Sequence, residues 1–189
     1  MGRRLGRGPR WYRDAIYFDL TARGEEGSGW LSGSHHRVNL FPDDPDARRL
    51  HDQNKLLSEL LDGCAGRVEL PRFPSPGKAV VQAHCQHKAV LGFDAERDVL
   101  AATGLEPDVL DSGCCGMVGA FRFERGEHFD VSVRAAERVL LPAVRAVGPD
   151  SVVVADGFSC REQIRQGTGR RALHLAEVLG AGLDGKEAR

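Results

Sequence analysis

Five cysteines are the residues of this chain best suited to chemistry: Cys64, Cys85, Cys114, Cys115 and Cys160. An odd count with two adjacent members is a poor match to a secreted disulfide framework. In a reducing compartment, buried and inert thiols are the simplest interpretation. Metal, cluster or thiol chemistry is the alternative, and no C-x2-C pair settles the choice. The position of each cysteine relative to the predicted strands therefore decides the interpretation.

Three short apolar runs are predicted as buried strands, and each ends a few residues before a cysteine. The strands at 79–83, 107–111 and 151–155 precede Cys85, the Cys114-Cys115 pair and Cys160, respectively. Helical patterns lie at 94–103, 127–147, from 161 and at 171–179, so strands and helices alternate. Such alternation predicts an α/β fold, a short mainly parallel sheet flanked by helices. In such sheets ligands bind beyond the carboxyl ends of the strands, where these cysteines would lie.

Four sulfurs at one sheet edge are enough to ligate an iron–sulfur cluster or a zinc ion. Gly113 and Gly116 flank the paired cysteines, and glycine allows close backbone approach and N–H donation to sulfur. His84 and His87 flank Cys85 and are either neighbours of the ligands or hydrogen-bonded structural histidines. Cys64 follows a leucine-rich helix that ends at Gly63, and we interpret it as incidental. No residue is assigned a catalytic role.

The chain divides into three predicted segments. Residues 1–37 are rich in Arg and Gly, contain one candidate strand at 15–20, and are predicted to be poorly ordered or loosely attached. Residues 38–182 form the predicted domain, which begins with a helix capped by the acidic run at 43–46 and ended by Gly63. The long helix at 127–147 is predicted to bury a face that includes Val131, with a kink at Pro142. Residues 183–189 are a tail.

Charge and hydropathy exclude several partners. The formal net charge of −1 gives no reason to expect nucleic acid, and the basic N-terminal run is interpreted as a solvated tail. No apolar run approaches the roughly 20 residues of a membrane-spanning helix. The opening Met-Gly-Arg-Arg lacks the apolar core of an export signal. A cytoplasmic location is the expectation.

Three motifs carry a family resemblance. The segments His-Cys-Gln-His-Lys-Ala at 84–89, Leu-Asp-Ser-Gly-Cys-Cys-Gly-Met at 110–117 and Ala-Asp-Gly-Phe-Ser-Cys-Arg-Glu-Gln at 155–163 resemble the cysteine-rich "CCG" domain. That domain occurs in heterodisulfide reductase subunits and in the iron–sulfur parts of glycolate and glycerol-3-phosphate oxidoreductases. The chain is most similar to the C-terminal end of fused FAD-linked oxidases described as D-lactate or related 2-hydroxy-acid dehydrogenases. With the Asn-Leu-Phe-Pro stretch at 39–42, the resemblance covers roughly residues 38–180.

The resemblance implies an electron-transfer module. A 2-hydroxy acid of the D-lactate or glycolate type would reduce a flavin elsewhere, and electrons would pass through clusters to this domain. Cys85, Cys114, Cys115 and Cys160 would hold an iron–sulfur cluster, most simply of the 4Fe-4S type, beside His84, His87, Gly113 and Gly116. The FAD would sit on a partner or a missing domain. The implied partners are a flavin-containing dehydrogenase subunit or domain and a ferredoxin-like iron–sulfur domain.

The chain also departs from that family. It lacks the flavin domain, the C-x2-C-x2-C-x3-C ferredoxin run, an earlier cysteine-rich half and a C-x-x-C ending. Gly33-Ser34-His35-His36 stands where relatives carry a further cysteine. We therefore expect a truncated module that needs a flavin partner and is not active alone. The alternatives are a structural zinc-binding interaction domain, a dithiol/disulfide reductase component that cycles Cys114 and Cys115, and a remnant without a function of its own.

Overall fold

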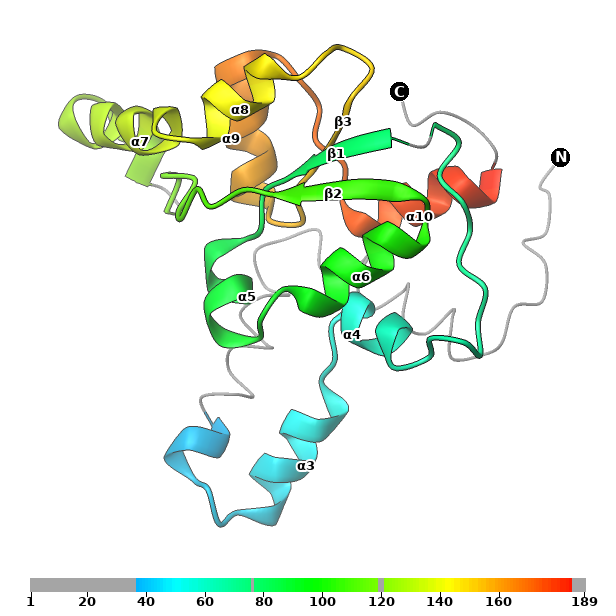
Figure 1. Ribbon diagram of the computed structural model, residues 1–189. Coiled ribbons are helices and arrows are strands. Elements are labelled where there is room, and N and C mark those ends of the chain that lie inside the picture. The colour runs from blue at the N-terminus through cyan, green and yellow to red at the C-terminus, as the bar shows by residue number, and fades with distance from the viewer. Residues whose placement is uncertain (1–36, 76, 119–120, 185–189) are drawn as a thin grey trace, which may run out of the picture.

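The computed structural model describes residues 37–75, 77–118 and 121–184. Its centre is a sheet of three parallel strands in the order β2-β1-β3, shown in Figure 1. The strands are β1 (Gly77–Val81), β2 (Leu105–Val109) and β3 (Val152–Val154). Helices cover both faces of the sheet, so the predicted α/β fold with a parallel sheet is confirmed.

Strand β1 sets the register of the whole sheet. Gly77 pairs with Leu105 of β2 and Ala79 pairs with Val152 of β3, so all three strands end at one edge. Strand β2 begins two residues before the predicted start because Leu105, which is buried, already pairs with β1. Pro107 is tolerated inside β2 because this strand lies at an edge of the sheet that the described residues form.

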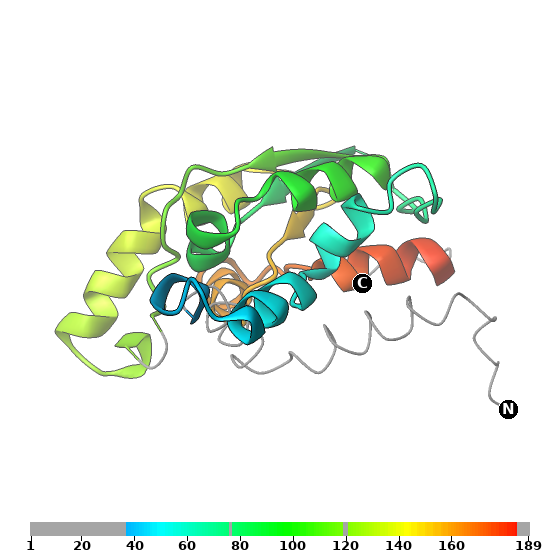
Figure 2. The same ribbon diagram turned by 90° about the horizontal axis from the view of Figure 1, so that it is seen from below.

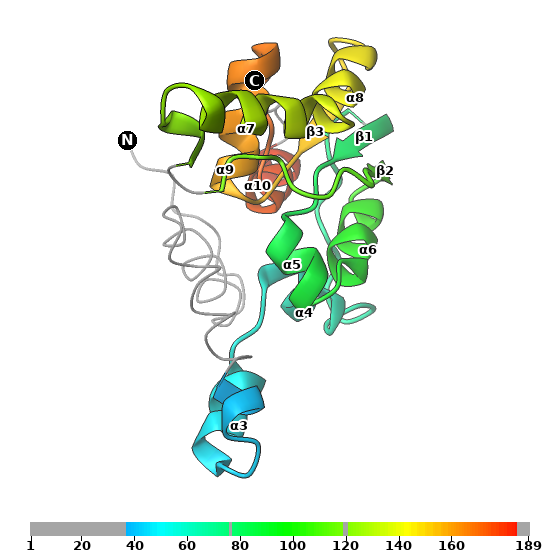
Figure 3. The same cartoon turned by 90° about the vertical axis from the view of Figure 1, so that its left-hand side faces the viewer.

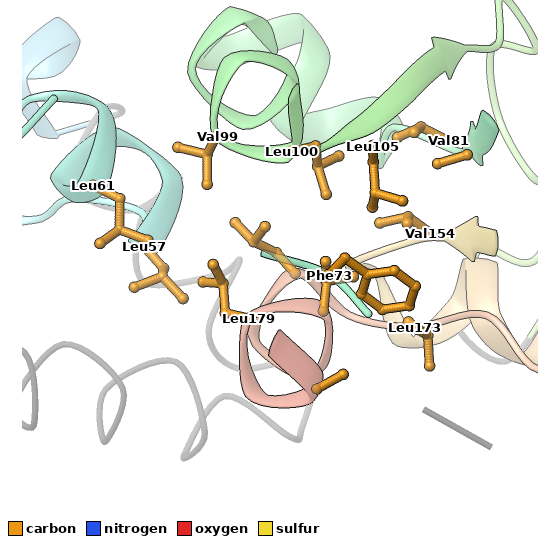
Figure 4. Packing of buried hydrophobic residues seen from close by; sticks show 14 of the residues in the cluster. Leu57, Leu61, Phe73, Val81, Val99, Leu100, Leu105, Val154, Leu173 and Leu179 are labelled. Carbon is orange, nitrogen blue, oxygen red and sulfur yellow. The ribbon is translucent and has the colours of Figure 1, made fainter. Parts of the chain in front are cut away.

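Alternating side chains of the strands enter two separate hydrophobic cores. Val81 and Val154 pack on one face, with the leucine-rich faces of the helices before β1 and at the C-terminus (Figure 4). Val80 and Val153 pack on the opposite face, and the core there also contains Cys115 and Cys160. Two of the five cysteines are thus part of the folded interior rather than of the surface.

The helices surround the sheet unevenly. Helix α3 stands apart from the sheet and the other helices in Figures 1 and 3, and α7 and α10 lie at opposite ends of the molecule in Figure 2. The helical segments are α3 (Pro45–Gln53), α4 (Leu57–Asp62), α5 (Cys85–Val90), α6 (Asp94–Ala102), the 3-10 turn η1 (Phe121–Phe123), α7 (Glu127–Glu137), α8 (Leu140–Ala146), α9 (Phe158–Thr168) and α10 (Leu175–Asp184).

Two helices predicted as continuous are each broken in two. Helices α3 and α4 are separated by extended backbone at Asn54 and Leu56. The Glu59 carboxylate accepts a hydrogen bond from the Leu56 N–H at 2.7 Å, which caps the N-terminus of α4. Helices α7 and α8 are separated at Arg138 and Val139. The physical reason is Pro142, which has no N–H to donate to the Arg138 carbonyl and whose ring collides with it.

The break also changes which face of α7 is buried. Ser132 and Ala136 are buried, whereas Val131, expected in the core, is exposed. The prediction for Val131 is therefore wrong by one position, because Ser132 is buried in its place. The prediction assumed one continuous helix and so carried the apolar face of α8 past the break into α7.

Three further segments differ from the prediction. Helix α5 was not predicted, and α9 begins at Phe158, three residues before the predicted start. Helix α10 begins at Leu175 rather than 171, because Leu173 forms a parallel bridge with Val154 and extends the sheet. The candidate strand at 15–20 lies outside the described residues.

No helix in the described part of the chain is both long and apolar enough to cross a membrane.

Truncation of a core leucine tests the first of the two cores. Leu100 of α6 is fully buried, so Leu100→Ala should lower the free energy of unfolding by about 2–5 kcal/mol in a urea titration. Leu183 of α10 is 58% exposed, and Leu183→Ala should change it by no more than about 0.5 kcal/mol. Equal effects of the two substitutions would contradict the described packing.

Candidate functional site

Four cysteines lie together where the three strands end. Cys85 is the first residue of α5, Cys114 and Cys115 lie in the loop after β2, and Cys160 is in the first turn of α9. Cys85, Cys114 and Cys115 are each close enough to Cys160 to disfavour its ionisation. Figure 3 views the molecule from this side, with α5, α9 and the chain that follows β2 in view.

The four thiols form two unequal pairs. Cys115 and Cys160 are buried and their side chains are hydrogen-bonded to each other; we call them the inner pair. Cys85 and Cys114 are exposed and also hydrogen-bonded to each other; we call them the outer pair. A further side-chain hydrogen bond joins Cys114 to Cys115, so the pairs are connected. The arrangement is one continuous group of sulfurs with one side open to solvent.

Hydrogen bonds lower the pKa of the Cys115 thiol. The Cys160 thiol donates to Cys115 and, with the Met117 N–H, lowers the pKa of Cys115 to about 7 against the opposing effect of burial. The same bond and the surrounding thiols raise the pKa of Cys160 well above its ordinary value. Burial raises the pKa of Cys114, although the Gly116 N–H donates to its sulfur at 3.3 Å. At neutral pH the Cys115 thiol is therefore partly ionised.

The two glycines that flank the paired cysteines have different roles. Gly116 has φ +86° and lies so close to α7 that a Cβ atom there would overlap the Ser132 carbonyl oxygen. Gly113 has φ +66°, and a Cβ there would meet nothing within 4 Å. Gly116 therefore allows the cysteine loop to pack against α7, whereas Gly113 supplies only a left-handed turn.

A third glycine brings the two other loops together. A Cβ on Gly157 would come within 2.6 Å of the His84 ring and 3.3 Å of the Cys160 sulfur. His84 therefore packs directly against the start of α9. Burial lowers the pKa of His84, with Asp156 acting in the opposite direction, so the imidazole is neutral beside the thiols at neutral pH.

His87 lies against a buried carboxylate. Its Nδ1 lies 3.5 Å from Oε2 of Glu96, a residue of α6 that is only 1% exposed. The His87 ring contacts Phe93, with ring centroids 5.2 Å apart. Burial lowers the pKa of His87 despite the nearby Asp156 and Glu59 carboxylates. These contacts connect α5 to α6, which positions the helix that Cys85 begins.

Other polar and sulfur-containing side chains have structural contacts. Cys64 lies in the turn after α4, where its sulfur accepts from Arg67 at 3.6 Å. The Asp156 carboxylate accepts from the Leu175 N–H at the start of α10 at 2.8 Å. Met117 is buried and packs in the second core. Lys88 forms an exposed ion pair with Asp111 at 3.4 Å.

Sequence reasoning missed one buried polar contact beside the cysteines. The Gln82 side chain is 1% exposed and accepts from the Ser112 hydroxyl at 2.5 Å. The available signal was a glutamine that interrupts an apolar run next to a cysteine motif.

The cysteine and histidine side chains of this site do not surround a single point. Within the described residues no group of three or more His, Cys, Asp or Glu side chains is arranged to hold one metal ion. The thiols instead satisfy one another in pairs. Two cavities of about 270 and 600 Å³ lie elsewhere, one between α4 and α6 and one around α3, and neither is lined by a cysteine.

The chain is similar to parts of two dehydrogenases. It is 34% identical over 116 residues to a subunit of the anaerobic glycerol-3-phosphate dehydrogenase of Escherichia coli K12, which is 60% of this chain and 28% of that subunit. It is 28% identical over 109 residues to the D-2-hydroxyglutarate dehydrogenase of Pseudomonas putida KT2440, which is 56% of this chain and 10% of that protein. No family model and no solved structure matches. The matched part of this chain thus spans 28% of the first relative and 10% of the second, well under half of either.

The flanking glycines give a direct test of the cysteine loop. Gly113→Ala should lower the free energy of unfolding by about 1–2 kcal/mol, the cost of a left-handed alanine. Gly116→Ala should cost about 1–3 kcal/mol more, because the Ser132 carbonyl must also move. Urea unfolding of the metal-free reduced proteins measures both. A Gly116→Ala variant no less stable than Gly113→Ala would refute the close contact with α7.

The inner pair can be tested by titration. Cys160→Ala removes the donor that stabilises the Cys115 thiolate, so the pKa of Cys115 should rise above about 7. Ultraviolet thiolate absorbance against pH, on the metal-free reduced protein, should show less thiolate at neutral pH than in the unsubstituted chain. Cys64→Ala, which alters a thiol outside the group, should leave the titration near neutral pH intact. If the thiolate absorbance at neutral pH persists in Cys160→Ala, the thiolate belongs to a residue other than Cys115.

Proposed function

We propose that this chain is an iron–sulfur-binding electron-transfer module of a dehydrogenase, with Cys85, Cys114, Cys115 and Cys160 as ligands. The observation that carries the proposal is the gathering of these four cysteines, from three loops, at one edge of a parallel sheet. Chance placement of inert thiols gives no reason for all three strand ends to be followed by cysteine. The carboxyl-terminal edge is also where this class of sheet binds its ligands.

The donor set suits a cluster. Four thiols match the ligand number of [4Fe–4S] clusters, and such ligands bind as thiolates. Cys115 already ionises at a pKa of about 7, and the Gly116 N–H donates to the Cys114 sulfur at 3.3 Å. Backbone N–H groups directed at sulfur are a means of tuning cluster potential. In the metal-free chain the thiols hydrogen-bond to each other, and these hydrogen bonds must be exchanged for bonds to metal.

A bound cluster would accept and release single electrons. This chain's residues would hold it, bury one side of it through the inner pair and leave the outer pair toward solvent or a partner. A partly exposed cluster is accessible for electron transfer to a neighbouring domain. No described residue is proposed to act on the organic substrate.

The names of the relatives support a dehydrogenase. One is a glycerol-3-phosphate dehydrogenase subunit and the other a D-2-hydroxyglutarate dehydrogenase. We propose that the oxidised substrate is a hydroxy compound, of the 2-hydroxy-acid type, and that its hydride passes to FAD on a partner subunit or domain. A ferredoxin-like domain would relay electrons to the cluster. The free thiols suit a reducing compartment, so we propose a cytoplasmic location.

Anaerobic reconstitution with iron and sulfide tests the proposal. The chain should acquire the broad visible absorbance of an iron–thiolate cluster, with iron and acid-labile sulfide in equal amounts. Cys114→Ser and Cys160→Ser should each lose most of that absorbance because each removes one ligand. Cys64→Ser should retain it, since Cys64 lies outside the group.

Two outcomes would overturn the proposal. A colourless protein with one tightly bound zinc would favour a structural zinc domain. Equal loss of colour in Cys64→Ser and Cys114→Ser would show that iron binds without regard to the four-cysteine group.

A further inference from the structure

A buried glutamine connects two of the cysteine loops. Gln82 directly follows β1, and its side chain is 1% exposed. Its Oε1 accepts from the Ser112 hydroxyl at 2.5 Å, and its Nε2 donates to the Ala83 carbonyl at 3.1 Å. Its backbone N–H donates to the Val154 carbonyl of β3 at 2.9 Å. One residue therefore contacts the chain that follows β1, the chain that follows β2 and the end of β3.

The contacts lie two residues from the cysteines of the outer pair. Ala83 is two residues before Cys85, and Ser112 is two residues before Cys114. The inner pair is held differently, because Cys115 and Cys160 are packed in the second hydrophobic core. Cys85 and Cys114 are exposed and obtain no such packing. Apart from the hydrogen bond between the two thiols themselves, their separation depends on contacts at the base of their loops.

One other side-chain contact between these two loops is a weaker candidate for that task. The ion pair between Lys88 and Asp111 also joins them, at 3.4 Å. Its side chains are 45% and fully exposed, and exposed pairs of long side chains contribute little in water. A hydrogen bond to a buried amide is different, because breaking it leaves a polar group without water or partner.

We propose that the Gln82–Ser112 hydrogen bond is the brace that sets the spacing of Cys85 and Cys114. Gln82 is thereby a positioning residue for the outer half of the cysteine site. The role of Gln82 in holding a cluster rests on the proposed function, whereas its role in spacing the two thiols does not. The brace explains why an apolar strand is followed by a buried polar side chain at this point.

Thiol cross-linking of the metal-free reduced chain tests the spacing directly. In a Cys64→Ser background, dibromobimane should bridge Cys85 and Cys114, and peptide mass spectrometry gives the yield of that bridge. Gln82→Met preserves side-chain length and removes the hydrogen bond. Ser112→Ala removes the same hydrogen bond by deleting the donor hydroxyl, which belongs to the less buried of the two residues. Both should lower the rate of bridging about threefold or more, the factor expected for the loss of one net hydrogen bond.

Two conservative variants serve as controls. Ser112→Thr keeps the hydroxyl and should restore bridging to near the unsubstituted rate. Asp111→Asn removes the exposed ion pair between the same loops and should leave the rate unchanged. If Gln82→Met does not fold, as judged by circular dichroism, Ser112→Ala and Ser112→Thr still decide the question. Equal bridging rates in Ser112→Ala, Ser112→Thr and the unsubstituted chain would overturn the brace.

The reconstituted protein separates failure of the brace from failure of the proposed function. If the unsubstituted chain binds a cluster, Ser112→Ala should bind it with a shifted reduction potential and faster iron loss to a chelator, while Asp111→Asn should not. An unchanged potential and rate would overturn the role of the brace in cluster binding. If the unsubstituted chain binds no cluster, the proposed function fails, and the cross-linking rates still establish or refute the brace.

Discussion

The parallel pairing of β1 with both of its neighbours is the constraint on which the rest of this structure depends. Because β2 and β3 both run parallel to β1 and in register with it, the chain after each strand must leave from the same edge. Each connection then returns through helices that cover one of the two faces. The cysteines meet only because this pairing brings together segments that are up to 75 residues apart, from Cys85 to Cys160.

The two cores make the cysteines unequal. Cys115 and Cys160 are packed with Val80 and Val153, so their positions are fixed by the same apolar contacts that stabilise the fold. Cys85 and Cys114 face solvent and depend on hydrogen bonds at the base of their loops. Binding of a cluster at the proposed site would consequently be linked to folding, because any group that holds the inner pair also holds part of the core.

The similarity to dehydrogenases is confined to a small share of each relative. The chain covers 28% of the glycerol-3-phosphate dehydrogenase subunit and 10% of the D-2-hydroxyglutarate dehydrogenase. Under the proposed function, the cysteine group at one sheet edge would hold the redox centre. The exposed outer pair marks the side from which such a centre would be reached.

The sequence by itself determined the α/β class, the three parallel strands and the cysteine that follows each of them, because short apolar runs and glycine-rich turns are local signals. It also indicated, through Pro142, a kink in the helix predicted over 127–147, which the structure shows as a break at Arg138 and Val139. Tertiary structure alone decided which thiols are buried and which pair together. It also decided that Gly116 packs on α7, and that Gln82 reaches a serine 30 residues away. Those features depend on how distant segments dock, and no local periodicity or propensity encodes the distance between two loops.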